Sequence, residues 1–135
     1  MARPQDIVVL DSWAVLAWFQ GEPSAGAVER LLLSGPGRGQ LLMTVVNAGE
    51  VWYIYARRIS EQVADARIGQ LKMAGIEIID TDWELTVQAA RYKSRHPIAY
   101  ADCFAASLAR RENARLVTGD PEFRHLESEL SIMWI

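Results

Sequence analysis

The sequence has a single cysteine, Cys103, and therefore no internal disulfide framework, which fits a reducing cytoplasm. It also lacks a long hydrophobic run, because the apolar stretch nearest the N-terminus, Ile7–Leu10, is too short for a signal peptide or a membrane span. The net charge of −3 gives no electrostatic sign of a nucleic-acid partner. We therefore expect a cytoplasmic protein that has no membrane segment.

Several familiar catalytic motifs are missing as well. The only glycine-rich loop, residues 34–40, lacks the lysine and the serine or threonine of a phosphate-binding loop. His96 and His125 do not have the spacing of metal ligands, and no serine or cysteine triad can be recognised. Cys103 stands beside Asp102, where we expect a small core residue rather than a nucleophile.

What is present is the composition of an ordinary globular protein, with 50% hydrophobic and 23% charged residues. A length of 135 residues is enough to bury one core, so we expect a single domain that spans residues 1–135. Short, continuous apolar runs alternate with longer helical patterns, which is typical of strands covered on both faces. Strands are predicted at Ile7–Leu10, Leu41–Met43, Ile76–Ile79, Arg115–Thr118 and Ser131–Trp134.

The segments between these strands have helical periodicity and recognisable ends. Ser60 and Asp82 are suited to cap helices, and Pro97 requires the helix after Asp82 to end before it. Strands separated by helices predict an α/β fold, a three-layer sandwich with a mainly parallel five-stranded sheet flanked by helices. Further helices are predicted at about Ser12–Phe19, Pro23–Leu33, Thr44–Arg58 and Ala99–Glu112.

Four acidic residues stand at positions that are unusual for charges. Asp11 directly follows the first predicted strand, and Asp120 follows the fourth strand by two residues. Glu50 lies within an apolar helical face, and Asp102 is the only charge in "IAYADCFAASLA". Each residue also has a purely structural explanation. Asp11 and Asp120 could be helix caps or turn residues, and Glu50 could pair with an arginine such as Arg57 or Arg58. Asp102 could be stabilised by the dipole of its helix.

The carboxyl ends of parallel strands meet at one edge of a sheet, which is where sites form in such folds. Carboxylates gathered at one edge would repel one another. The repulsion is about 4 kcal/mol for each pair of charges ~4 Å apart at a surface-like dielectric. Either some of them are protonated or cations lie between them. A set of oxygen ligands without histidine or cysteine indicates Mg²⁺ or Mn²⁺ rather than zinc.

The sequence resembles the PIN domain, and specifically the VapC-type toxins of bacterial toxin–antitoxin pairs. "IVVLDSWAVLAWFQGEPSA", "TVVNAGEVWY", "YADCFAASLA" and "LVTGDPEF" are similar to the four acidic blocks of that family, in the same order and with similar spacing, over nearly the whole chain. The resemblance implies a parallel sheet flanked by helices. It places the family's acidic quartet on Asp11, Glu50, Asp102 and Asp120, and supporting polar positions on Ser12, Asn47 and Thr118.

The same resemblance implies an endoribonuclease that depends on Mg²⁺ or Mn²⁺, forms a homodimer and is held inactive by a cognate antitoxin. We expect Asp11, Asp102 and Asp120 to bind the metal directly or through water, and Glu50 to hold a ligand water or orient the nucleophile. Ser12 and Thr118 would orient the carboxylates. The RNA target is left open.

Two other functions fit part of the sequence. A phosphoacceptor receiver domain also clusters acids on a small α/β fold, but it needs paired acids after the first strand and a lysine near the fifth, and neither is present. A non-catalytic PIN-like module would use the same acids only to bind a basic partner, and metal binding would distinguish it from the enzyme. The intact acidic quartet favours the enzyme.

Tryptophans and arginines leave further alternatives open. Trp13, Trp18 and Trp52 fall in core-like helical patterns, which favours packing or a dimer interface over base stacking. Basic groups such as Arg57–Arg58 could contact phosphates, although ordinary solvated helix faces explain most of them.

Overall fold

A parallel sheet forms the centre of the protein. The computed structural model describes residues 7–33 and 40–135, and in these ranges five strands lie in the order β3-β2-β1-β4-β5. Every neighbouring pair is parallel, which confirms the predicted sheet. The strands are β1 (Ile7–Leu10), β2 (Gln40–Thr44), β3 (Ile76–Ile79), β4 (Arg115–Thr118) and β5 (Ser131–Trp134).

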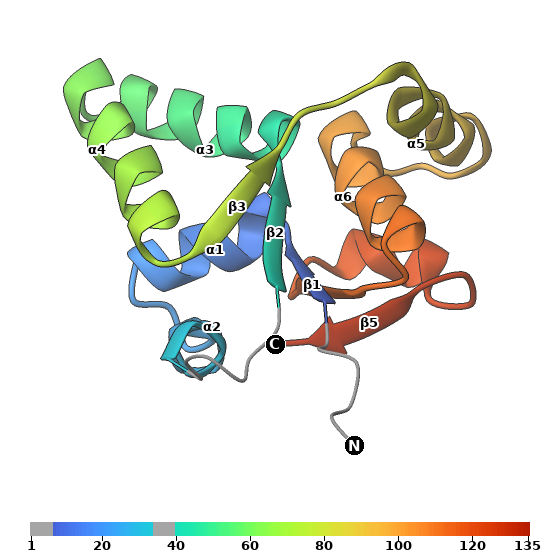
Figure 1. Cartoon of the computed structure of the whole chain (residues 1–135), viewed down its shortest axis with the longest axis horizontal. Helices are drawn as coiled ribbons and strands as arrows, with labels where there is room; N and C mark the ends of the chain where they lie inside the picture. The colour runs from blue at the N-terminus through green and yellow to red at the C-terminus, as the bar shows by residue number, and fades with distance from the viewer. Residues whose placement is uncertain (1–6, 34–39) are drawn as a thin grey trace.

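Helices cover both faces of this sheet and confirm the predicted three-layer sandwich. Figure 1 shows α3 and α4 on one side of the strands and α5 and α6 on the other. Helices α1 and α2 pack with α3 and α4 around the same core cluster. The helices are α1 (Ser12–Phe19), α2 (Ala25–Leu33), α3 (Val45–Arg58), α4 (Glu61–Met73), α5 (Trp83–Arg95), α6 (Tyr100–Arg111) and the 3₁₀ helix η2 (Pro121–Leu126).

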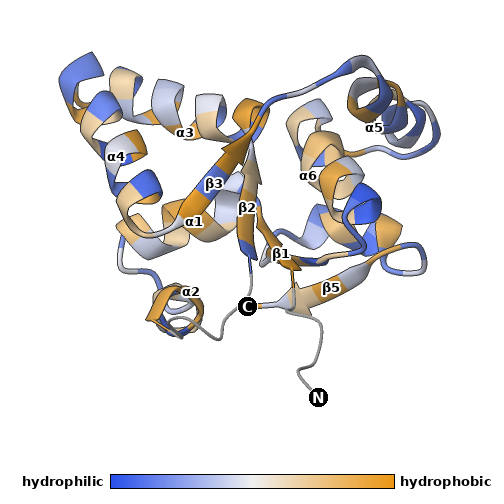
Figure 2. Ribbon diagram, viewed as in Figure 1, coloured by the Kyte–Doolittle hydropathy of each residue, from blue (hydrophilic) through white to orange (hydrophobic). Residues whose placement is uncertain are grey.

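The central strand is apolar throughout because its successive side chains enter two different cores. Val8 and Leu10 pack in the cluster built with α1 to α4, whereas Val9 packs in the cluster built with α5 and α6. Adjacent side chains of a strand point to opposite faces, so a sheet covered twice needs apolar residues at every position. Figure 2 shows this as orange strands between helices that carry their blue, hydrophilic residues outward.

The helix ends follow local chemistry. Ser60 accepts a hydrogen bond from the Val63 amide at 3.1 Å, and Asp82 accepts one from the Leu85 amide at 2.8 Å, as predicted for N-caps. Three predicted starts were early. Thr44 and Ala99 are the caps of α3 and α6 rather than their first residues, and α2 begins at Ala25 instead of Pro23. Differences of one or two residues are usual at helix ends.

Two further predictions concern the glycine-rich loop and the absence of a membrane span. Most of the glycine-rich loop, residues 34–39, lies outside the described part of the chain. Among the helices of residues 7–33 and 40–135, none has the length and apolarity needed to cross a membrane.

The order of the strands reverses its direction at β1. The chain passes from β1 to β2 and β3 on one side, and it returns to β4 and β5 on the other side. Ligand sites of parallel sheets form beyond the carboxyl ends of the strands where the direction of winding reverses. In this fold that point lies between the ends of β1 and β4, directly at Asp11 and Thr118.

Candidate metal centre

Asp11 lies at the carboxyl end of β1 and is fully buried. Its carboxylate caps α1 by accepting a hydrogen bond from the Ala14 amide at 2.8 Å, and it accepts a second one from the Thr118 hydroxyl at 2.5 Å. The pKa of Asp11 is raised to about 7, chiefly by burial; the two hydrogen bonds oppose the shift, and the charges of Asp120 and Glu50 add to it. Asp11 is therefore both a cap and a member of a cluster of like charges.

Asp102 lies in the first turn of α6 and is 8% exposed. Burial raises its pKa to about 8, and a hydrogen bond with Glu122 raises it as well. The charges of Asp120, Asp11 and Glu50 act in the same direction. A carboxyl in this environment holds its proton at neutral pH unless a cation compensates its charge.

Asp120 is held in the short turn between β4 and η2. Its amide donates to the Thr118 hydroxyl at 3.0 Å, and its carboxylate accepts from the Glu122 amide at 3.0 Å, which makes it the N-cap of η2. The helix that it caps is a 3₁₀ helix. Asp120 is therefore the helix cap that the sequence suggested, and its carboxylate also lies near those of Asp102 and Glu122.

Glu50 lies on α3 and is half-buried. Within residues 7–33 and 40–135 it forms no ion pair with Arg57 or Arg58, the two arginines considered as its partners in the sequence analysis. Its charge instead raises the pKa of both Asp11 and Asp102. The four acids that the sequence singled out therefore lie close enough to interact.

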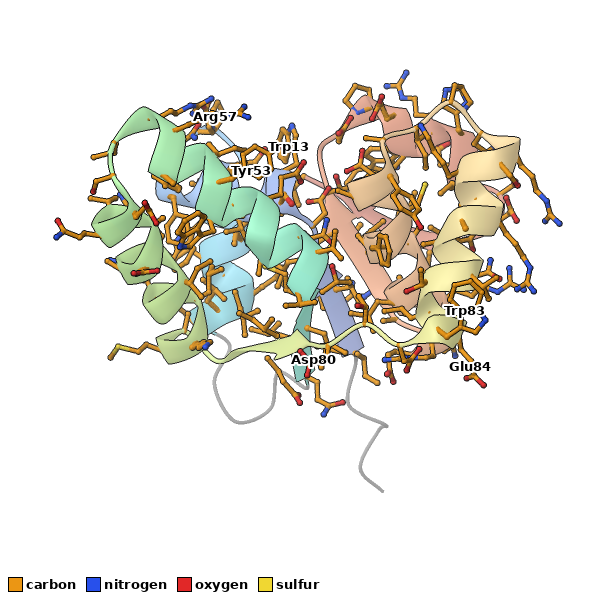
Figure 3. The ribbon with its side chains drawn as sticks, turned by 90° about the horizontal axis from the view of Figure 1, so that it is seen from above. Trp13, Tyr53, Arg57, Asp80, Trp83 and Glu84 are labelled. Carbon is orange, nitrogen blue, oxygen red and sulfur yellow. The ribbon has the colours of Figure 1, made fainter. Side chains whose placement is uncertain are left out.

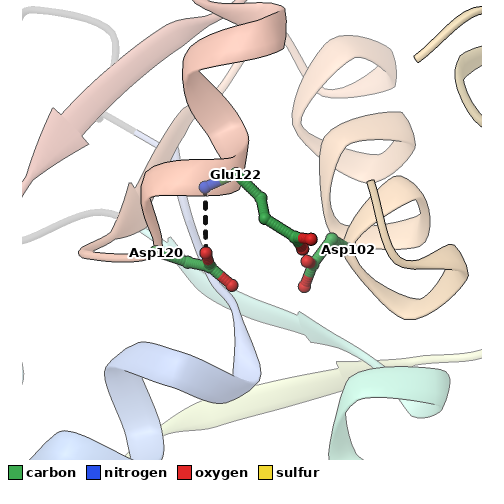
Figure 4. A group of neighbouring side chains, drawn as sticks. All are labelled: Asp102, Asp120 and Glu122. Carbon is green, nitrogen blue, oxygen red and sulfur yellow. Dashed lines mark hydrogen bonds between the residues drawn. The ribbon is translucent and has the colours of Figure 1, made fainter. Parts of the chain in front are cut away.

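Three carboxylates offer oxygens close enough for one ion to contact them all. Oxygens of Asp102, Asp120 and Glu122 all lie within 4.8 Å of one another. Figure 4 shows these side chains turned toward each other, Asp102 from α6 and the other two from the start of η2. Asp11 and Glu50 are not members of this group of three, although their charges reach Asp102.

The sequence analysis did not include Glu122. It lies two residues after Asp120 and is exposed, so it reads as an ordinary acidic residue in the first turn of a helix. Its Oε2 also accepts a long hydrogen bond, 3.5 Å, from the Ala99 amide just before α6. The signal in the sequence that could have indicated Glu122 is its spacing of two residues from Asp120. Two residues of one tight first turn can both direct their side chains toward the end of the preceding strand.

A buried polar network fixes the elements that carry these acids. The Asn47 side chain donates to the Ala101 carbonyl at 3.0 Å, next to Asp102, and its backbone amide is capped by Thr44 at 3.0 Å. The Thr44 hydroxyl is also hydrogen-bonded to the Asn47 side-chain oxygen. The Ser12 hydroxyl donates to the Asn47 carbonyl at 3.1 Å rather than to a carboxylate. Asn47 thus connects α1, α3 and α6 behind the acids.

The donor set fits a divalent cation that prefers oxygen. The clustered groups are all carboxylates, and their mutual repulsion in a partly buried site is relieved by a positive ion. Cys103 is buried with a pKa raised to about 11, chiefly by burial, so it remains a thiol in the core as expected. The residues of this edge therefore suit Mg²⁺ or Mn²⁺ better than a soft metal.

Gly119 is required where the β4–η2 turn approaches α1. A Cβ at this position would lie 2.2 Å from the Cη2 atom of Trp13, far inside van der Waals contact. We expect Gly119→Ala to lower the free energy of unfolding by about 1–3 kcal/mol, because the rigid indole or the turn has to move. Urea unfolding measures the change.

The matched control for this change is Gly49→Ala in α3, where a Cβ would meet nothing within 4 Å. We expect that substitution to be neutral or to stabilise the helix. The double variant Gly119→Ala/Trp13→Leu should recover part of the lost stability. Equal stability of Gly119→Ala and the wild type would show that the close approach does not constrain the turn.

The fold is shared with toxins of known structure. VapBC2 from Rickettsia felis, solved with a promoter DNA fragment, is 19% identical with a TM-score of 0.71, and the match covers 94% of this chain and 97% of that chain. VapBC-1 from nontypeable Haemophilus influenzae is 18% identical with a TM-score of 0.74, covering 95% and 97%. VapC20 from Mycobacterium tuberculosis, described as a sarcin-ricin loop cleaving toxin, is 18% identical with a TM-score of 0.71, covering 91% and 95%.

A comparison with curated protein sequences finds no significant match. The family model of the PIN domain, however, matches residues 8–129, from the second residue of β1 to the segment after η2. This match includes all the acidic positions described above. The chain belongs to the PIN-domain family.

Proposed function

We propose that this protein is a metal-dependent endoribonuclease and the toxin of a toxin–antitoxin pair. The observation that carries the proposal is the convergence of five carboxylates at the switch point of a PIN-domain sheet. Oxygens of three of them, Asp102, Asp120 and Glu122, lie within 4.8 Å of one another. Asp11 and Asp102 are buried and have raised pKa values. The residues are Asp11, Glu50, Asp102, Asp120 and Glu122.

Asp102, Asp120 and Glu122 would hold Mg²⁺ or Mn²⁺, with Asp11 beside them as a direct or water-bridged ligand. A bound divalent ion supplies an activated water at neutral pH and neutralises charge on the phosphate. Because metal binding requires deprotonated carboxylates, the ion and the protons of Asp11 and Asp102 compete for the same oxygens.

The other residues orient these groups. The Ala14 amide donates to one carboxylate oxygen of Asp11 and the Thr118 hydroxyl donates to the other. These two hydrogen bonds fix the orientation of the carboxylate. Asn47 holds the start of α6 next to Asp102. Glu50 is half-buried and has no ion-pair partner in the described ranges, and it would accept a proton or a hydrogen bond from the attacking water.

The similar structures support the substrate and the partner. VapC20 is a sarcin-ricin loop cleaving toxin, which supports RNA as the substrate. The Rickettsia and Haemophilus structures are of VapBC, and a similar structure from Klebsiella pneumoniae is described as a toxin–antitoxin complex, which supports a cognate antitoxin. A guanidinium of such an antitoxin would pair with the acidic cluster and exclude the metal or RNA. The family resemblance also favours a homodimer.

The test is cleavage of RNA by the purified protein. We expect cutting of total bacterial RNA in millimolar Mg²⁺ or Mn²⁺ and none in EDTA, because the carboxylates alone cannot neutralise the phosphate. Brief induction in a bacterial host should arrest growth, and mapping of new 5′ ends should identify a small set of cleavage sites. Cleavage that continues in EDTA would exclude the metal mechanism, and the absence of both metal binding and cleavage would favour the non-catalytic module.

A further inference from the structure

A cavity of about 620 Å³ is lined in part by Trp13 of α1. It lies between α1, the segment that follows α1 and the end of α3. Its lining combines an indole, a guanidinium and three polar side chains with four apolar residues: Trp13, Arg58, Gln20, Glu22, Ser24, Leu16, Ala17, Pro23 and Ile135. An aromatic ring, a cation and several hydrogen-bonding groups therefore face one open space.

This cavity is joined to the candidate metal centre through Trp13. Trp13 follows Asp11 by two residues, and its ring lies directly against Gly119, the neighbour of Asp120. Trp18 and Trp52 pack against the core cluster on this side of the sheet, as the sequence pattern indicated, whereas Trp13 lines the cavity. Its position is thus explained by the site rather than by the core.

Helix α3 adds a second aromatic residue and a second cation. Tyr53 follows Glu50 by three positions and so lies on the same face of the helix, and it is 44% exposed. The Arg57 guanidinium lies over its ring, 5.2 Å from the centroid, which holds the ring in place. Figure 3 shows Trp13, Tyr53 and Arg57 toward the same edge of the view, with Asp80, Trp83 and Glu84 toward the opposite edge.

We propose that this aromatic–arginine surface, formed by Trp13, Tyr53, Arg57 and Arg58, binds unpaired nucleotides of the RNA next to the bond that is cut. The inference rests on the proposed function and adds the side chains of this protein that contact the substrate. One base enters the cavity against Trp13, a neighbouring base lies on Tyr53, and the arginines contact the phosphates between them.

The charges favour a polyanion over a protein segment. The acidic cluster needs a cation before it accepts a phosphate, while the adjacent surface carries two arginines and one lining acid, Glu22. A nucleic-acid strand with one phosphate at the metal continues onto positive charge at the next positions. Aromatic side chains stack on bases only where the bases are not already paired and stacked, so the surface selects single strands, loops or bulges over duplex RNA.

The experiment measures kcat and KM for cleavage of a randomised single-stranded RNA in Mg²⁺ or Mn²⁺. We expect Tyr53→Ala to raise KM about tenfold with little change in kcat, and Tyr53→Phe to behave as the wild type, because stacking needs only the ring. Arg58→Ala should raise KM and reduce the slope of log KM against log salt concentration by about 0.7, the share of one phosphate contact on a single strand. Fully paired RNA should compete more weakly than single-stranded RNA.

Trp83→Ala and Arg95→Ala serve as matched controls, because both side chains are exposed on α5, away from this surface. Neither should change KM. All variants should melt at a higher temperature in Mn²⁺ than in EDTA, because an ion that binds only the folded state stabilises it. Unchanged KM in Tyr53→Ala and Arg58→Ala would overturn the inference while the nuclease remains. The same holds if these variants weaken only the binding of the antitoxin, which would assign the surface to that protein. A wild type that cuts no RNA would instead remove the proposed function itself.

Discussion

Asp102→Asn should abolish RNA cleavage while leaving the fold intact. We expect a loss of about a thousandfold or more in kcat, on the order of the loss seen when a preorganised group that stabilises transition-state charge is removed. Asparagine has the shape of the protonated carboxyl but cannot supply a negative oxygen to the metal. The change therefore removes chemistry without creating a cavity.

The stability of this variant separates a functional from a structural role. Burial and the hydrogen bond with Glu122 already favour the neutral form of Asp102, and the asparagine amide can donate to the same Glu122 carboxylate. We expect a free energy of unfolding equal to or above that of the wild type in EDTA at pH 7. The control is Asp65→Asn on α4. In the structure the Trp52 indole N–H donates to Asp65 at 2.9 Å, and the side-chain oxygen of asparagine can accept the same hydrogen bond.

Urea unfolding in EDTA and initial rates of cleavage measure the two properties on the same samples. Asp65→Asn should cut RNA as the wild type does. If Asp102→Asn unfolds the metal-free protein, Asp102 is a structural residue and the loss of cleavage says nothing about the metal. Full cleavage by Asp102→Asn would remove it from the site.

The metal-free protein should lose stability as the pH rises from about 4 to about 8. In the unfolded chain, Asp11 and Asp102 release their protons near pH 4, whereas in the folded chain their pKa values are about 7 and about 8. Between these limits the folded state binds more protons than the unfolded state. Each carboxyl then lowers the free energy of unfolding by about 1 kcal/mol per pH unit.

Urea unfolding in EDTA between pH 5 and pH 8 measures this dependence, where about 1 kcal/mol per unit is the expected slope for each group. Asp102→Asn should have a shallower slope, because one of the two protons is no longer present. Saturating Mn²⁺ should reverse the trend, since metal binding improves as the carboxyls lose their protons. A metal-free stability that rises with pH over this range would contradict the burial of two like charges at the sheet edge.

The positions of Asp11, Glu50, Asp102 and Asp120 could be predicted because their surroundings are apolar or follow a strand. Charges in such places stand out in a linear sequence, and a parallel sheet brings strand ends together. The continuous apolar run of β1 similarly predicted a strand covered on both faces. These features depend on local pattern and on the general geometry of sheets.

Glu122, Ser12 and Trp13 could not be placed in the same way. The role of Glu122 depends on how η2 folds back toward α6, and the Ser12 hydroxyl reaches a carbonyl 35 residues away. Trp13 has the spacing of a core residue, yet its ring passes over Gly119 and lines an open cavity. Contacts between distant elements decide these positions, and no periodicity along the chain contains them.

Binding of Mn²⁺ at about pH 8, above the pKa of Asp11 and near that of Asp102, tests the metal centre most directly. Electron paramagnetic resonance distinguishes free from bound Mn²⁺ while the ion is titrated into the wild type, Asp102→Asn, Asp120→Asn and the control Asp65→Asn. We expect the wild type and Asp65→Asn to bind Mn²⁺ alike and both site variants to lose this binding. Equal binding of Mn²⁺ by all four proteins would contradict a metal centre at Asp102 and Asp120.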